Sequence, residues 1–268
     1  MNPAESVRLC TSDGVFLSAQ YFSGVSDAPA YVLGHGFTGS ASRPAVTAVS
    51  ERLNRRGAAV LALDFRGHGT SEGLSTVGVD EVADVSAAVQ YLRLSRPGLP
   101  VISLGFSMGA SVVIRQAGGA SGASGLGTEG AGQWLPDAVI AVSGPGHWYE
   151  RGTAPMRRVH LGLETWVGRM ALRWSFKTRI GTGWDLLPVS PVEVAGAIAA
   201  PLLVVHGDAD PYFGLEHPRM IAAVAPRADL WIERGMGHGE TAMIPALLDR
   251  IDDWARTAVG AGSATMAE

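Results

Sequence analysis

The chain of 268 residues has little of what disulfide-linked, membrane-spanning or nucleic-acid-binding proteins contain. Cys10 is its only cysteine, which excludes an internal disulfide and a cysteine-based metal site. No run of about 18 apolar residues predicts a membrane-spanning helix, and no basic segment followed by an apolar one predicts a secretory signal. The net charge of −4 provides no general basic surface for nucleic acid. We therefore expect a cytoplasmic protein.

Short apolar runs that alternate with amphipathic segments dominate the rest of the chain. Hydrophobic residues make up 47% of the sequence, as expected for one large globular domain. Residues 7–22 contain Asp-Gly between two extended segments and predict a hairpin. Further strands are predicted at 30–36, 58–65, 100–107, 137–144, 200–208 and 228–235, and helices at 41–56, 80–94, 110–118 and 241–257. This alternation predicts an α/β fold with a doubly wound, mainly parallel sheet and an antiparallel hairpin at its N-terminal edge.

Two stretches interrupt the alternation. Residues 118–132 are rich in Gly, Ser and Ala and predict a surface insertion. Residues 146–200 form a long insertion that contains four of the seven tryptophans, and we expect a helical cap on a core made of 1–145 and 201–268. Helical spacing places five apolar side chains on one face of this insertion, namely Val159, Leu163, Trp166, Met170 and Trp174.

These aromatic side chains have two interpretations. They could only dock the insertion onto the sheet, or they could line a binding cavity. The second interpretation predicts a substrate pocket made of Trp148, Trp166, Met170, Trp174 and Tyr212.

The stretch Gly-Phe-Ser-Met-Gly at 105–109 follows a predicted buried strand and precedes a predicted helix. Gly-X-Ser-X-Gly in this context is the pattern of a nucleophile elbow, in which a sharp turn exposes the serine hydroxyl. A serine that only caps the helix is the simpler alternative. The context favours Ser107 as a nucleophile.

A nucleophilic serine needs a base, and the base needs a carboxylate that orients it. Asp208 and Asp210 both follow the strand predicted at 200–208, and we favour Asp210 because it lies farther beyond the strand end. Asp208 is then expected to stabilise the turn of its own loop. Among the later histidines, His217 is expected at the surface, whereas His238 lies in a glycine-flanked loop after the last strand. We therefore predict Asp210 and His238 as the partners of Ser107.

Attack on a carbonyl also requires donors for the developing oxyanion. The backbone N–H groups of Met108 and Phe37 are the predicted donors, one directly after the serine and one in the loop after the strand at 30–36. His35 is expected to brace that loop.

The loop at 64–73 is rich in charges and turn-forming residues. We expect Asp64 and Arg66 to organise it and to pair locally, and His68 to be structural rather than a second base.

Together these motifs, from Gly-His-Gly-Phe-Thr-Gly at 34–39 to Gly-Met-Gly-His-Gly-Glu at 235–240, resemble the α/β-hydrolase superfamily in its capped esterase, lipase and acyl-peptidase branches. The resemblance covers essentially the whole chain. It implies a Ser-His-Asp hydrolase with a two-amide oxyanion hole and a cap at 146–200. A serine at the elbow argues against the dehalogenase and epoxide-hydrolase branches, where an aspartate is expected. The single "HGF" departs from the HGGG type of oxyanion loop.

These observations predict a carboxylic-ester hydrolase that needs neither a metal nor an organic cofactor. Its expected partner is a small, hydrophobic acyl substrate. Thioester hydrolysis or acyl transfer, amide or peptide hydrolysis, cofactor-free perhydrolysis and a ligand-binding module without chemistry remain the alternatives. Residues 151–180 contain seven basic residues against Glu164 alone, which indicates either an anionic substrate or carrier or a solvated basic helix face. The oligomeric state is not predicted.

Overall fold

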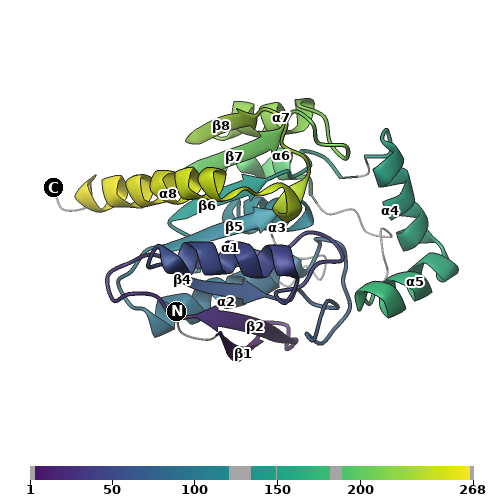
Figure 1. Ribbon diagram of the computed structural model, residues 1–268, viewed down its shortest axis with the longest axis horizontal. Helices are drawn as coiled ribbons and strands as arrows, with labels where there is room; N and C mark the ends of the chain where they lie inside the picture. Colours follow the sequence, from purple (N-terminus) through teal and green to yellow (C-terminus); the bar gives the residue numbers. More distant parts are fainter. Residues whose placement is uncertain (1–3, 121–133, 149, 182–188, 266–268) are drawn as a thin grey trace.

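A single sheet of eight strands organises the part of the chain that the computed structural model describes, residues 4–120, 134–148, 150–181 and 189–265 (Figure 1). Its spatial order is β1-β2-β4-β3-β5-β6-β7-β8. The strands are β1 (Glu5–Cys10), β2 (Phe16–Phe22), β3 (Ala30–Gly34), β4 (Ala59–Leu63), β5 (Val101–Phe106), β6 (Ala138–Val142), β7 (Leu202–Gly207) and β8 (Ala228–Glu233). β2 pairs antiparallel with β1 and β4, and all other pairs are parallel. The predicted fold class and hairpin are confirmed.

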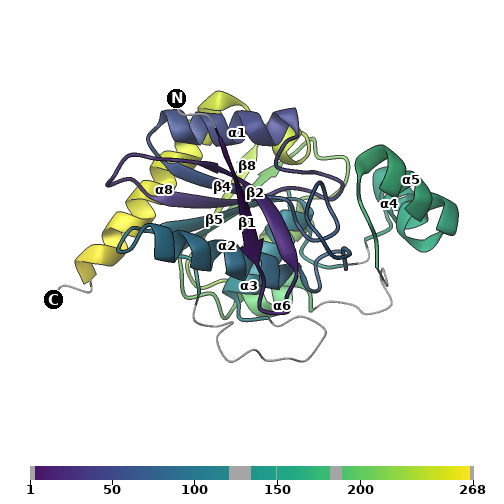
Figure 2. The ribbon, with the colours of Figure 1, turned by 90° about the horizontal axis from the view of Figure 1, so that it is seen from below.

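Helices cover both faces of the sheet, because the central strands are buried on both sides (Figure 2). One face is covered by α1 (Pro44–Arg55) and α8 (Pro245–Thr265), whose buried side chains include Leu53 and Ile251. The other face is covered by α2 (Glu81–Ser95), α3 (Met108–Ala117) and α6 (Pro191–Ala195). Ile221 of α7 (Glu216–Val224) packs in the hydrophobic core on this second face, together with side chains of α2, α3 and α6. None of the helices in the described ranges has the length and hydropathy needed to span a membrane.

Two further helices, α4 (Ala154–Glu164) and α5 (Trp166–Phe176), lie apart from these layers at one end of the molecule (Figures 1 and 2). They face the loops after β3, β5 and β7, because residues of all these segments line one cavity. We call α4 and α5 the cap helices. The division into a core of 1–145 and 201–268 and a cap of 146–200 stays a prediction. Trp184 and most of the Gly/Ser/Ala-rich segment lie outside the described residues.

The cap helices correct one sequence expectation. A continuous helical face through Val159, Leu163, Trp166, Met170 and Trp174 does not form. Thr165 is extended, with φ −107° and ψ 146°, and its side chain accepts a hydrogen bond from the N–H of Gly168 at the start of α5. The helical period therefore breaks at Thr165, and the apolar side chains on either side of it point in different directions.

Candidate active site

The turn between β5 and α3 holds Ser107 in an unusual backbone conformation, with φ 51° and ψ −114°. Two glycines make this turn possible by allowing close backbone approach. A Cβ on Gly105 would lie 2.2 Å from the carbonyl oxygen of Gly109, and a Cβ on Gly109 would lie 2.5 Å from that of Gly34. Strain held in place by its surroundings is typical of functional sites. The local sequence thus lifts the serine out of the strand, as an elbow requires.

Ser107, His238 and Asp210 form one chain of hydrogen bonds, although they come from three separate loops. The Ser107 hydroxyl donates to Nε2 of His238 over 2.8 Å. Nδ1–H of the same ring donates to Oδ2 of Asp210 over 2.7 Å. The distances lie within the range expected for a nucleophile, a base and the group that orients it. The structure therefore brings all three predicted residues together.

The two candidate carboxylates lie in different places. The side chain of Asp210 is fully buried, and its other oxygen accepts from the backbone N–H of Tyr212 over 2.8 Å. Burial alone would raise the pKa of Asp210, but the hydrogen bond and charge of His238, together with that backbone donor, hold it below its ordinary value. Asp208 instead accepts from the N–H of Gly235 over 2.6 Å. The sequence analysis expected Asp208 to stabilise its own loop. The structure instead shows that its side chain contacts the loop after β8.

One aromatic side chain packs on the imidazole of His238, and a second histidine lies beside the carboxylate of Asp210. The ring of Tyr212 is tilted by 30° against it, with centroids 4.2 Å apart. His206, on β7, is completely buried and donates from Nε2 to the carbonyl of Phe213 over 3.0 Å. Its Nε2 also lies 3.6 Å from Oδ2 of Asp210. The sequence analysis did not identify His206, because it reads simply as the end of a buried strand.

The loop after β3 approaches the serine closely. A Cβ on Gly36 would lie 3.3 Å from the Cβ of Ser107. His35 braces this loop, as predicted: its Nδ1–H donates to the carbonyl of Gly36 over 2.7 Å, and its Nε2 accepts from the N–H of Phe65 over 3.2 Å. Burial lowers the pKa of His35 to about 4, so the ring is neutral. The backbone of Phe37 follows directly, and Phe37 and Met108 both lie at the wall of the cavity that contains Ser107.

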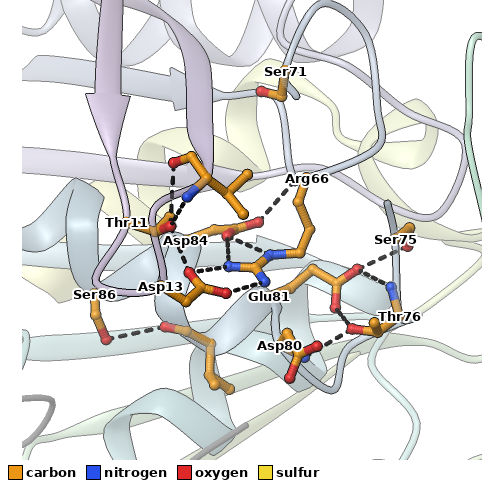
Figure 3. Close-up of polar contacts among 12 residues, drawn as sticks. Thr11, Asp13, Arg66, Ser71, Ser75, Thr76, Asp80, Glu81, Asp84 and Ser86 are labelled. Carbon is orange, nitrogen blue, oxygen red and sulfur yellow. Dashed lines mark hydrogen bonds and ion pairs between the residues drawn. The ribbon is translucent and has the colours of Figure 1, made fainter. Parts of the chain in front are cut away.

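The charged loop at 64–73 is organised differently from the prediction. Asp64 accepts from the N–H groups of Ala41 and Thr70 and does not pair with Arg66. Arg66 lies between Asp84 and Asp13, with nitrogen–oxygen distances of 2.8 and 2.7 Å (Figure 3). Burial alone would lower the pKa of Arg66, but these two carboxylates raise it above its ordinary value.

The residues between this loop and α2 hold the end of the segment that follows α5. Glu81 accepts from the hydroxyls of Ser75 and Thr76 (Figure 3). Ser75 in turn pairs with Ile180 in a parallel bridge.

His68 is fully buried, and its ring centroid lies 5.1 Å from that of His35. Burial lowers the pKa of His68 to about 4. Its burial agrees with a structural role, which stays a prediction.

A cavity of about 1140 Å³ opens above Ser107. Its wall is mainly apolar and includes Val77, Met156, Val159, Leu172, Phe176 and Phe213. Of the predicted pocket residues, Trp148 and Tyr212 lie at this wall. Trp166, Met170 and Trp174 do not, and the two tryptophans are 75% exposed. Their assignment to the pocket is wrong, because the break at Thr165 turns them outward.

Four charged residues line the cavity: Arg43, Glu150, Arg158 and Glu240. Only Arg158 belongs to the basic segment that the sequence analysis singled out, and the other three were not predicted. Oε2 of Glu240 would lie 3.3 Å from a Cβ on Gly36, so this carboxylate lies beside the loop after β3. Its place two residues after His238 is the only sequence signal that could have indicated it.

His217 also differs from its prediction as a surface residue. It is 3% exposed, and its Nδ1 accepts from the N–H of Gly146 over 3.0 Å. It thus ties the start of α7 to the start of the insertion. In the described residues, no three histidine, cysteine or acidic side chains cluster closely enough to hold a metal ion.

Comparison with known proteins places this geometry in a family. The family model described as serine aminopeptidase, S33, matches residues 28–184, which is more than half of the chain. The chain belongs to this family. It is an α/β-hydrolase of the serine hydrolase type, and the resemblance inferred from the motifs is confirmed.

Solved structures agree with the fold of this α/β-hydrolase. The esterase Pf2001 of Pyrococcus furiosus superposes with a TM-score of 0.72 at 24% identity, covering 96% of this chain and 93% of that one. The α/β-hydrolase GrgF of Penicillium sp. sh18 superposes with a TM-score of 0.73 at 18% identity, covering 97% and 100% of the two chains.

A curated relative is similar over a shorter stretch. The thiohydrolase aneE of Aspergillus aculeatus is 31% identical over 102 residues, which is 37% of this chain and 31% of the relative. The chain thus spans about a third of that protein's length.

Proposed function

We propose that this α/β-hydrolase cleaves carboxylic esters through an acyl-enzyme on Ser107. The observation that carries the proposal is the hydrogen-bonded chain from Ser107 through His238 to Asp210, with links of 2.8 and 2.7 Å. Ser107 and His238 line a large, mainly apolar cavity. Such a cavity suits a hydrophobic acyl or alcohol group.

The geometry supports a conventional acyl-transfer sequence. His238 takes the proton of Ser107 as its oxygen attacks the ester carbonyl, and Asp210 stabilises the resulting imidazolium. The N–H groups of Phe37 and Met108 are the proposed donors to the oxyanion. His238 then returns the proton to the departing alkoxide, which leaves as the alcohol. In the second half, His238 takes a proton from water as the hydroxide oxygen attacks the acyl carbon, and it returns that proton to Ser107.

The environment of His238 supports this assignment. The carboxylate of Asp210 accepts from Nδ1–H, which fixes the tautomer whose Nε2 is free to accept the serine proton. Tyr212 limits rotation of the ring from one side. Both contacts hold the base in the orientation that proton transfer requires.

A thioester substrate is the second candidate. It is favoured by the similarity over 102 residues to a protein named a thiohydrolase. The same serine chemistry would serve, with a thiolate leaving in place of an alkoxide. We expect the large cavity to accept the acyl part in either case.

A fluorophosphonate probe and a substrate panel test the proposal. The probe should label Ser107 in the folded protein and should not label the Ser107→Ala variant. A panel of p-nitrophenyl esters, acyl thioesters and amino-acid anilides, matched in acyl group, should give the highest kcat/KM on the esters. A higher kcat/KM on thioesters would favour the second candidate, and absence of labelling would favour a binding module that lacks the chemistry.

A further inference from the structure

The outward side of α5 is apolar, aromatic and basic where a surface helix is ordinarily polar. The helix contains no buried residue. Trp166 and Trp174 are both 75% exposed and Val167 is 67% exposed. At 100° per residue, five side chains of α5 fall within an arc of about 120°. Together with Lys177, the exposed left-handed residue that directly follows the helix, we call them the outer face of α5: Trp166, Val167, Met170, Arg173, Trp174 and Lys177.

The opposite side of the same helix contacts the cavity and α4. Leu172 and Phe176 line the cavity, and Gly168 packs so closely on α4 that a Cβ there would lie 2.6 Å from the Cα of Gly162. The cap helices therefore cannot rotate to bury the outer face without giving up these contacts. Within the described ranges, the exposed tryptophans are consequently a property of the folded chain rather than of a loosely placed helix.

The charges on this face are also available. Other basic side chains of the cap helices already have partners: Arg157 donates to the carbonyl of Gly152, and Arg169 donates to the carbonyls of Leu163 and Gly181. Arg173 and Lys177, by contrast, have no hydrogen bond or ion pair with any residue that the structure describes. The outer face thus presents two cations beside two indole rings.

We propose that the outer face of α5 docks the protein on an anionic lipid surface. Indole rings favour the boundary between acyl chains and headgroups, and arginine and lysine bury their aliphatic stems while keeping their charges at the headgroups. Anionic headgroups supply the counter-charge that Arg173 and Lys177 lack. A second copy of the chain fits less well, because pairing two such faces would bring four cations together.

Docking in this way would also set the cavity beside the lipid. The inner side of α5 forms part of the cavity wall, so a molecule leaving the bilayer would meet the cavity next to the docked helix. The proposal concerns adsorption to the surface and is independent of the chemistry at Ser107.

Co-sedimentation with vesicles tests the proposal. Vesicles of phosphatidylcholine alone and of a three-to-one mixture with phosphatidylglycerol serve as the two surfaces. The wild type should pellet with the mixed vesicles and much less with the neutral ones. The double variant Trp166→Gln/Trp174→Gln should lose at least about tenfold in partition coefficient. The variant Arg173→Gln/Lys177→Gln should lose about 30-fold on the mixed vesicles, about one kcal/mol per charge.

A control variant is available on a helix of the core. Leu94 on α2 is 67% exposed, so Leu94→Gln removes a comparable apolar side chain outside the cap helices and should pellet like the wild type. All variants should hydrolyse a water-soluble p-nitrophenyl ester at the wild-type rate, which verifies folding. If neither the wild type nor any variant hydrolyses the ester, the proposed function is refuted. The vesicle-binding result still tests the docking proposal, because docking does not depend on the chemistry at Ser107.

Several outcomes would overturn the docking proposal. They include a wild type that remains in the supernatant with both vesicles, or tryptophan variants that pellet like the wild type. Equal binding to neutral and mixed vesicles would refute the role of charge. A dimer in light scattering that Trp166→Gln/Trp174→Gln dissociates, without vesicle binding, would assign the face to a second copy. Binding of an acidic acyl carrier protein without vesicle binding would assign it to that partner.

Discussion

Replacing Asp210 by asparagine should disable the site while leaving the fold in place. The carboxylate oxygen Oδ2 accepts from Nδ1–H of His238 over 2.7 Å, whereas Oδ1 accepts from the N–H of Tyr212 over 2.8 Å. Asparagine can retain the second bond through its carbonyl oxygen. It then presents its NH₂ group to the imidazole, which favours the tautomer with the proton on Nε2. Nε2 can no longer accept the proton of Ser107.

The size of this effect follows from two losses. The hydrogen bond between a carboxylate and an imidazolium contributes about 2 to 3 kcal/mol, and the wrong tautomer adds a similar penalty. Together they amount to about 5 kcal/mol, or a loss of about 10⁴-fold in kcat.

The lowered pKa of Asp210 also makes the free energy of unfolding depend on pH. The carboxylate stabilises the fold above its ordinary pKa of 3.8, and this contribution is lost as the pH falls below that value.

Asp208→Asn is the matched control. Its Oδ1 accepts from the N–H of Gly235, a bond that asparagine can keep. We expect less than about a threefold change in kcat, because no reacting group contacts Asp208. The assay is steady-state hydrolysis of a p-nitrophenyl ester, with thermal unfolding of each variant as the control for folding. The reasoning is refuted if Asp208→Asn loses more activity than Asp210→Asn.

Three further predictions concern acid stability and substrate choice. Burial lowers the pKa values of His35 and His68 to about 4, so both rings are neutral in the folded protein. The free energy of unfolding should therefore be highest above pH 6.5 and should fall by about 3 kcal/mol per histidine towards pH 4. Urea unfolding measures this, and a free energy of unfolding that does not change with pH would contradict it. Trp148→Ala should lower kcat/KM for long-chain p-nitrophenyl esters by about tenfold, the effect of losing roughly 50 Å² of apolar contact, whereas Trp166→Ala should leave the chain-length profile unchanged. Glu240→Gln should raise kcat/KM for esters with an anionic acyl group by about tenfold relative to acetate, and equal changes for both would refute a role of its charge.

Local patterns were enough to predict the sheet and the three side chains that the structure joins by hydrogen bonds. Gly105 is required by a close backbone contact with Gly109, so this part of the turn is encoded where it occurs, whereas Gly109 is also required by the backbone of the distant Gly34. Asp210 and His238 could be identified because parallel strands bring their carboxyl ends to one edge, and each of these residues follows such a strand.

Features that depend on contacts between distant segments were not predictable in the same way. Arg66 pairs with Asp13 and Asp84, which lie 53 and 18 residues away, and nothing beside it in the sequence indicates either partner. His217 is buried because the start of the insertion folds over it. The outward turn of Trp166 follows from one extended residue, Thr165, whose effect on helical phase no periodicity analysis detects.

Labelling of Ser107 by a fluorophosphonate tests the central claim most directly. Intact-mass analysis of the labelled protein, followed by peptide mapping, should find one adduct per chain, on Ser107. Heat-unfolded protein and the Asp210→Asn variant should label far more slowly, because activation of the serine depends on the imidazole that Asp210 orients. An adduct on another residue, or equal labelling of folded and unfolded protein, would contradict the account.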